Sequence, residues 1–112
     1  MYEYDARLIR VIDGDTIDAS IDLGFDVWVK KRIRLYGIDA PESRTRDLEE
    51  KKKGIETKEK LEQLLEANEG IFTVRSKGVG KFGRCLGIII IDGDNINESL
   101  IKEGYAKEYL KK

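Results

Sequence analysis

Aspartates stand at the ends of the most apolar segments of this chain. Residues 12–16 read IDGDT, and residues 38–43 read IDAPES. Aspartate and glycine are poor strand formers and good turn formers, so both segments are expected to be turns. On these segments alone, two solvent-exposed turns and a carboxylate site that acts on a ligand are equally good interpretations.

The chain contains no histidine and one cysteine, which excludes several kinds of active site. Without histidine there is no Ser-His-Asp or Cys-His nucleophile, no HExxH zinc site and no histidine base. A single cysteine excludes an intramolecular disulfide and a zinc site built from cysteines, so Cys85 is expected to be a small core or edge residue. Catalysis by this chain would therefore use carboxylates, guanidinium groups, lysines and a hard metal ion.

Positive charge is concentrated in two segments, although the 112-residue chain has a net charge of only −1. Residues 71–91 contain no acidic side chain, and residues 30–34 read KKRIR. These segments supply eight cations, namely Arg75, Lys77, Lys81, Arg84, Lys30, Lys31, Arg32 and Arg34. Such segments can attract a polyanion locally, or they can be solvated strand faces.

Two other motifs are rejected by their context. GVGKFG at residues 78–83 has the glycine spacing of a dinucleotide fingerprint, but a strand-like segment follows it where a helix is required. The DGD triplets at residues 13–15 and 92–94 lack the later glycine and glutamate of a calcium-binding EF-hand loop. The second triplet is expected to be a hairpin exit and a helix cap.

Hydrophobic periodicity predicts mostly strands in the first half of the chain. The near period-two mixture of β-branched, aromatic and charged residues predicts a three-stranded antiparallel meander over residues 6–36. Residues 43–54 contain almost no apolar side chain and are expected to form a mobile charged loop. A helix is predicted over residues 55–68, with Leu61, Leu64 and Leu65 on its apolar stripe.

The second half predicts two more strands and a second helix. The strands are expected at residues 71–76 and 84–91, and the helix within residues 95–104. Asp94 or Asn95 is expected to be its N-cap, and Gly104 its C-terminal stop. This order is typical of a small five-stranded Greek-key barrel of the OB type, an all-β barrel with helices. One such domain accounts for residues 1–112.

Three motifs in order resemble the thermonuclease family, the staphylococcal nuclease-like domains. They are VIDGDT at residues 11–16, RLYGIDAPE at 34–42 and KFGR at 81–84, and DGDNINESLIKEGYAK adds a weaker signal. The resemblance covers nearly the whole chain. It implies the same OB barrel, with a helix between the third and fourth strands and a short helix after the fifth.

The resemblance also implies a calcium site and a hydrolytic reaction. Asp15, Asp39 and the backbone carbonyl of Ala40 would bind Ca²⁺, an ion that prefers oxygen ligands, with Asp13 as a supporting neighbour. Arg34 and Arg84 would stabilise the charge that a phosphodiester gains during attack, and Glu42 would orient or deprotonate the attacking water. The implied activity is calcium-dependent hydrolysis of DNA or RNA that leaves 3′-phosphate products.

Substrate contacts are expected from four residues that match the family less closely. They are Lys81, Phe82, Tyr105 and Tyr109. Phe82 stands where a tyrosine of some relatives can offer a hydroxyl to a terminal phosphate, and the match around the two tyrosines is loose. A nucleic acid that is single-stranded or locally frayed is the expected partner, and the chain is expected to act as a monomer.

A non-catalytic module of the same fold, which binds a single-stranded nucleic acid or a protein, is the alternative function. Such a module has no reason to keep the carboxylates and arginines of the site together. No segment has the length of a signal-peptide core or a membrane span. The chain is therefore expected in the cytoplasm, and a secreted chain whose leader had been removed would look the same.

Overall fold

The first half of the chain folds into an antiparallel meander. The computed structural model describes residues 2–109 and, at Phe82, the backbone alone. The strands are β1 (Glu3–Asp13), β2 (Thr16–Asp22) and β3 (Trp28–Leu35), paired in sequence order. Ile17 and Ala19 of β2 are fully buried, as alternation on a sheet with one solvated face requires. The meander predicted over residues 6–36 is confirmed.

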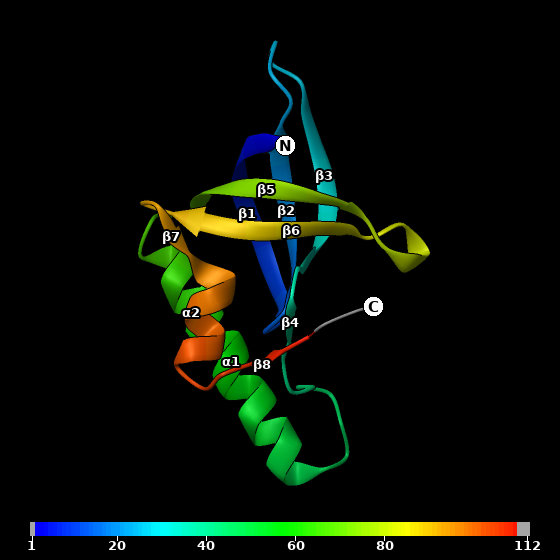
Figure 1. Cartoon of the computed structure of the whole chain (residues 1–112), viewed down its shortest axis with the longest axis vertical. Coiled ribbons are helices and arrows are strands. Elements are labelled where there is room, and N and C mark those ends of the chain that lie inside the picture. The colour runs from blue at the N-terminus through cyan, green and yellow to red at the C-terminus, as the bar shows by residue number, and fades with distance from the viewer. Residues whose placement is uncertain (1, 110–112) are drawn as a thin grey trace.

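Two further strands close the meander into a barrel. They are β5 (Ile71–Val79) and β6 (Cys85–Ile91). β5 lies antiparallel to β1, and β6 lies antiparallel to β5 and parallel to the end of β3, where Arg34 pairs with Leu86. Figure 1 shows β5 and β6 crossing the strands of the meander. Leu35 and Ile89, one from each half, are fully buried in the interior. The predicted five-stranded OB-type barrel is confirmed.

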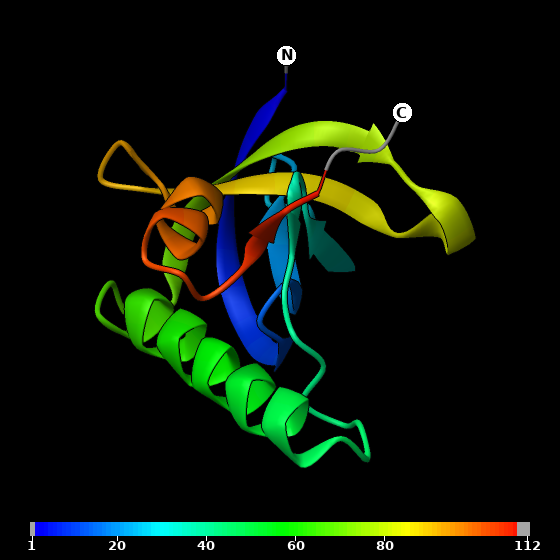
Figure 2. The ribbon, with the colours of Figure 1, turned by 60° about the horizontal axis from the view of Figure 1, so that its bottom comes forward.

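Two helices pack at the same end of this barrel (Figure 2). They are α1 (Leu48–Glu66) and α2 (Ile96–Lys102). Leu61 and Leu65 of α1 and Leu100 of α2 are fully buried. Burial of each leucine contributes about 1.5–3 kcal/mol to stability, so these side chains hold the helices against the barrel.

The charged segment before the predicted helix is itself helical, so the loop prediction for residues 43–54 is wrong from residue 48 onward. The Asp47 carboxylate caps α1 by accepting the backbone N–H groups of Glu49 and Glu50. Glutamate and lysine are good helix formers. The first turns of α1 are exposed to solvent and need no apolar stripe, so a low apolar content does not indicate a loop here.

Three strands of two residues each were not predicted from the sequence. They are β4 (Ile38–Asp39), β7 (Asp94–Asn95) and β8 (Lys107–Glu108). β8 pairs with β4 and brings Lys107 opposite Asp39. Asn95 is the N-cap of α2, since its side chain accepts the Glu98 N–H at 3.1 Å, and Gly104 ends the helix with a φ of 80°. No helix within residues 2–109 is both long enough and apolar enough to cross a membrane.

Candidate active site

The carboxylate of Asp15 joins the turn after β1 to the segment that follows β3. Its Oδ2 accepts the backbone N–H of Ala40 at 2.9 Å, and its Oδ1 accepts the Thr16 hydroxyl at 3.0 Å. The Asp15 carbonyl accepts the Leu35 N–H at 2.7 Å. Only 9% of Asp15 is exposed, and its carboxylate is held by Thr16 and Ala40 while its backbone is held by Leu35.

Arg34 lies against both carboxylates of the predicted metal site. Its Nη2 is 3.5 Å from Asp15 Oδ2 and 3.6 Å from Asp39 Oδ1, and its Nη1 donates to the Leu35 carbonyl at 3.0 Å. The Arg34 side chain is 15% exposed, whereas that of Asp39 is 58% exposed. The sequence interpretation that IDGDT and IDAPES form one site is therefore consistent with the structure, with Arg34 at the junction.

Asp13 makes a different contact from the other two aspartates. Its Oδ1 accepts a hydrogen bond from the hydroxyl of Ser43, which is buried at the end of IDAPES. Ser43 was not singled out from the sequence, because only the fold brings it to residue 13. Asp13 thus ties the two segments together beside the Asp15–Ala40 hydrogen bond, which agrees with a supporting role.

The donor set beside Arg34 suits a hard cation. Asp15 and Asp39 offer carboxylate oxygens, the ligands that Ca²⁺ prefers, and with Arg34 they carry one net negative charge. No three acidic or cysteine side chains within residues 2–109 gather into a metal-binding group. The carboxylates present therefore fit a cation that takes its remaining ligands from backbone carbonyls or water.

α1 supports both segments from behind, through two residues that the sequence did not indicate. A Cβ added to Gly54 would lie 2.5 Å from the backbone carbonyl group of Glu42, so glycine permits the close approach. A Cβ added to Gly14 would collide with the side chain of Thr57. The Thr57 hydroxyl also donates to the Tyr105 carbonyl at 2.7 Å. One face of α1 thus contacts both segments of the site.

Substituting Gly54 with alanine is expected to move the segment that carries Glu42. The added methyl group has no room, so we expect a loss of about 1–3 kcal/mol of stability from overpacking, measured by urea denaturation. Ile55→Ala, a change on the exposed side of the same turn, is the control and should cost less. Equal stability of Gly54→Ala and the wild type would show that the contact with Glu42 is loose.

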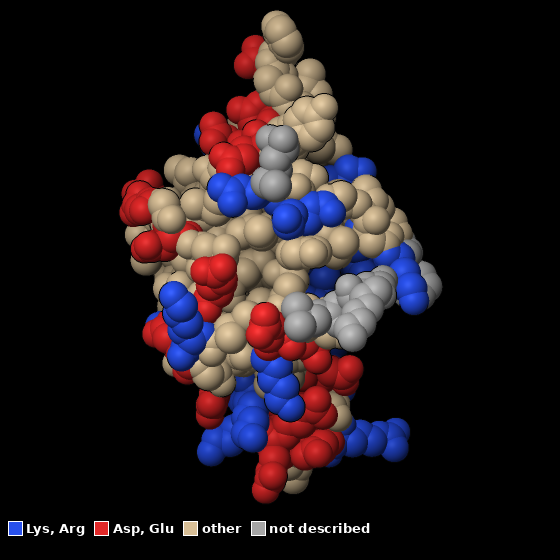
Figure 3. Space-filling view, in the orientation of Figure 1, with Lys and Arg blue, Asp and Glu red and all other residues tan. Residues whose placement is uncertain are grey.

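A cleft of about 510 Å³ opens on the side of Arg34 toward β6. Its cationic lining is formed by Arg34, Lys77, Lys81 and Arg84. In Figure 3 the blue side chains include a group over the β5–β6 end of the molecule, whereas blue and red are interleaved over α1. Glu98 and Glu108 also line the cleft, but the four cations outnumber them. The cleft therefore presents net positive charge next to a carboxylate pair, which is the arrangement that a phosphodiester at a metal site needs.

Asn97 forms part of the cleft wall and is a further residue that sequence reasoning missed. Its buried side chain accepts the Ile89 N–H at 3.1 Å and donates to the carbonyls of Tyr36 and Gly87 at 2.9 and 3.1 Å. These bonds join α2 to β6 and to the end of β3. An asparagine in a short helix gives no sequence signal of this role.

Some of the other predicted site residues line the cleft and others lie outside it. Tyr109 lines the cleft with its ring centroid 6.0 Å from Arg34 Cζ, and Lys81 lines it as an exposed cation. Tyr105 lies outside the cleft lining, with Lys60 of α1 5.8 Å from its ring. Glu42 is exposed on its loop and does not line the cleft. The Phe82 side chain lies outside the described residues.

Comparison with known proteins gives the family of the chain. A family model described as Staphylococcal nuclease homologue matches residues 32–112, which include both arginines, Asp39 and Glu42. This chain belongs to the staphylococcal nuclease family. The resemblance to this family is therefore confirmed, and the matched residues contain RLYGIDAPE and KFGR, whereas VIDGDT lies before them.

Relatives in this staphylococcal nuclease family carry nuclease names. Endonuclease YhcR of Bacillus subtilis is 33% identical over 114 residues, which cover 96% of this chain and 9% of that protein. Probable staphylococcal-like nuclease CAN1 of Oryza sativa is 38% identical over 87 residues, 77% of this chain and 24% of that protein. The SPbeta prophage-derived endonuclease YokF of Bacillus subtilis is 30% identical over 92% of this chain and 33% of that protein. The chain thus spans less than two thirds of these relatives.

Proposed function

We propose that this chain is a calcium-dependent nuclease that hydrolyses phosphodiester bonds of DNA or RNA and leaves 3′-phosphate products. The observation that carries the proposal is the position of Arg34, which touches Asp15 and Asp39 and also lines the basic cleft. The endonuclease names of two relatives support the same reaction class. A single-stranded or frayed substrate and a monomeric enzyme complete the proposal.

Asp15, Asp39 and the Ala40 carbonyl would hold the ion. When bound there, Ca²⁺ would neutralise phosphate charge and polarise the phosphoryl group. Asp15 is already oriented by Thr16 and by the Ala40 N–H, so little reorganisation of its carboxylate is needed. Asp39, which is mostly exposed, can turn toward an ion arriving from solvent.

The two arginines would hold the substrate phosphate. Arg34 is restrained by the Leu35 carbonyl and by its two carboxylate neighbours, and Arg84 follows the short 3-10 helix Lys81–Gly83 at the far side of the cleft. Planar guanidinium groups can donate two parallel hydrogen bonds to phosphate oxygens, and such donors act most strongly where charge develops in the transition state.

Glu42 would act on the attacking water. Its side chain is exposed, so water reaches its carboxylate, while its backbone is held by the contact with Gly54. A carboxylate with a fixed backbone and a solvated side chain can accept a proton from water or orient it by a hydrogen bond. The Glu42 side chain must turn toward the substrate to do this.

The proposal is tested by incubating the chain with single-stranded DNA and with single-stranded RNA, each with Ca²⁺ or with a chelator. We expect fragments that end in 3′-phosphate, formed with Ca²⁺ and not with the chelator. Fragments that form equally with the chelator would rule out the calcium mechanism. Binding without fragments under both conditions would favour the non-catalytic module of the same fold.

A further inference from the structure

The outer face of β1–β3 carries a regular row of cations that begins at the active site. Arg34, Arg32 and Lys30 occupy alternate positions of β3 and so point to the same side of the sheet, away from the buried Ile33 between them. Alternate residues of a strand are about 6.7 Å apart. The next alternate position is Trp28, so the row leads from the catalytic arginine to an indole.

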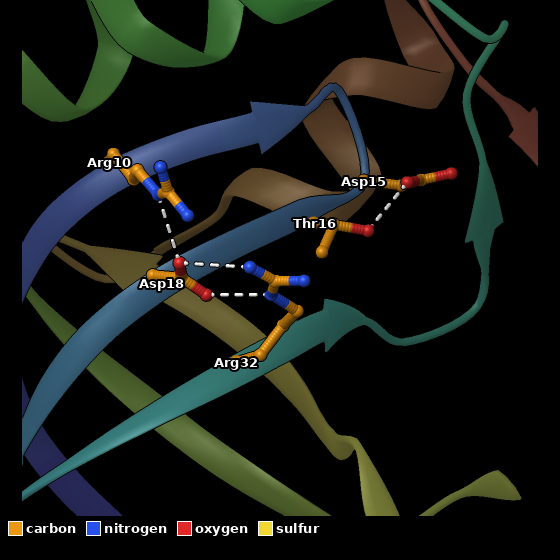
Figure 4. A network of polar contacts seen from close by, with 5 residues as sticks. All are labelled: Arg10, Asp15, Thr16, Asp18 and Arg32. Atoms are coloured by element: carbon orange, nitrogen blue, oxygen red, sulfur yellow. Dashed lines mark hydrogen bonds and ion pairs between the residues drawn. The ribbon is translucent and has the colours of Figure 1, made fainter. Parts of the chain in front are cut away.

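A second pair of cations stands beside this row, on β1. Asp18 of β2 lies between Arg10 of β1 and Arg32 of β3, since it is paired with each of them across the sheet. Its carboxylate is 3.1 Å from Arg10 Nε and 2.8 Å from Arg32 Nε. Figure 4 shows this trio on the sheet, with Thr16 at the start of β2 and Asp15 on the turn before it. Asp18 therefore orients two guanidinium groups toward the outside.

Positive charge exceeds negative charge along these two rows. The Arg10 and Arg32 side chains are 65% and 48% exposed, so donors remain free for a ligand. The Arg32 side chain beside Asp18 lowers the pKa of that carboxyl, which stays ionised. Arg7 of β1 and Lys30 of β3 lie on either side of Ser20 of β2, and within the described part of the chain neither forms an ion pair. Four cations thus face one carboxylate.

Trp28 ends the row with an exposed aromatic ring. The ring residue is 42% exposed, and the Arg7 guanidinium lies 5.1 Å from its centroid. Asp22 of β2 stands opposite Trp28 and accepts the Gly24 N–H at 2.8 Å, so a carboxylate lies beside the indole at the end of the row. Aromatic rings and guanidinium planes both stack on nucleic-acid bases, but only where the bases are unpaired.

We propose that the outer face of β1–β3 binds the part of a single-stranded nucleic acid that runs on from the phosphate held at Arg34. The proposal rests on the proposed nuclease function. From Arg34 to Trp28 the strand spans about 20 Å, which corresponds to about six nucleotides at the 3.4 Å rise of a stacked strand. Phosphates would lie along Arg32 and Lys30, and a base would stack on Trp28.

The test uses the fluorescence of Trp28, which is the single tryptophan of the chain. The protein is titrated in chelator with a thymidine dinucleotide and with oligothymidylate of about ten nucleotides, a length beyond the proposed site. We expect the longer strand to quench the fluorescence and the dinucleotide, which reaches only the cleft, to leave it unchanged.

A second test compares Lys30→Gln with Lys52→Gln, a control change at an exposed residue of α1. Binding of a labelled oligonucleotide to each variant is measured by fluorescence anisotropy. We expect Lys30→Gln to weaken binding about fivefold near 0.1 M salt and to lower the salt slope by about 0.7, since one phosphate contact is lost. Lys52→Gln should match the wild type. Equal binding by both variants would overturn the proposal.

The remaining outcomes separate this proposal from the proposed function. Cleavage in Ca²⁺ without any quenching by the longer strand would overturn the role of this face and leave the nuclease intact. Quenching without cleavage in Ca²⁺ would support the face as a binding site and overturn the nuclease. Equal quenching by a blunt-ended duplex of the same length would overturn the single-strand assignment.

Discussion

Replacing Arg84 with lysine is expected to lower turnover on single-stranded DNA by about 100-fold or more while the fold survives. Lysine keeps the positive charge but loses the planar pair of donors, and one well-placed donor contributes about 2.7–4 kcal/mol to transition-state stabilisation. Arg84 is partly exposed on the cleft wall, so the change creates no buried cavity. Initial rates in saturating Ca²⁺, with thermal melts of each variant, measure the effect.

Arg75→Lys is the matched control for this prediction. Arg75 belongs to the same basic segment, but it lies on β5 outside the cleft lining, where its Nε is 2.7 Å from Glu3 Oε2. We expect turnover close to that of the wild type, because an exposed ion pair of this kind contributes at most about 1 kcal/mol to stability. Near wild-type turnover of Arg84→Lys as well would show that Arg84 is only a surface cation.

Glu42→Gln is expected to reduce turnover by about 10²- to 10⁴-fold, the usual contribution of a general base, and to leave calcium binding nearly intact. Glutamine preserves the size of the side chain and removes its charge. Calcium binding is read from the rise in stability on adding the ion, about 2.7 kcal/mol at a hundredfold excess over the dissociation constant. Turnover and melting curves, each with Ca²⁺ and with chelator, give both quantities.

Asp15→Asn is the companion variant, because it changes the metal site and leaves Glu42 in place. We expect the calcium-dependent rise in Tm to be small or absent in this variant. The melt in chelator shows separately what is lost with the Asp15–Ala40 hydrogen bond. If both variants showed one defect that extra Ca²⁺ reversed, Glu42 would be a metal ligand and the division of roles would be wrong.

The strands could be predicted from the sequence because their signals are local. Ile17, Ala19 and Ile21 alternate with polar residues, and that pattern alone assigns β2 and its buried face. Low apolar content, in contrast, misassigned the first turns of α1, where a capping aspartate and helix-forming side chains decide the conformation. Apolar content indicates how much of a segment is buried, and it does not indicate whether an exposed segment is helical.

The candidate site could be predicted only where a motif marked it. Asp15, Asp39 and Arg34 stand in motifs, and the structure brings each aspartate within 3.6 Å of Arg34. Gly54 stands in no motif, and its contact with Glu42 depends on how α1 crosses the barrel. Ser43 ends IDAPES, but only the fold shows that its hydroxyl reaches Asp13. Contacts between segments far apart along the chain leave no periodic signal in the sequence. The residues that support the site could therefore be found only in the structure.

The parallel pairing of β3 with β6 has a consequence for how the chain folds. It joins Arg34 to Leu86, far along the chain, and such non-local closure costs chain entropy before it is repaid by contacts. Both arginines of the site meet only when this closure occurs, so recovered activity in a refolding experiment would report barrel closure. β6 pairs only with Ile33–Leu35 of β3, so Lys30, Lys31 and Arg32 have β2 as their one strand neighbour among the described residues, and their charges discourage pairing with another chain. The charges near the site thus also protect this exposed edge of the sheet against aggregation.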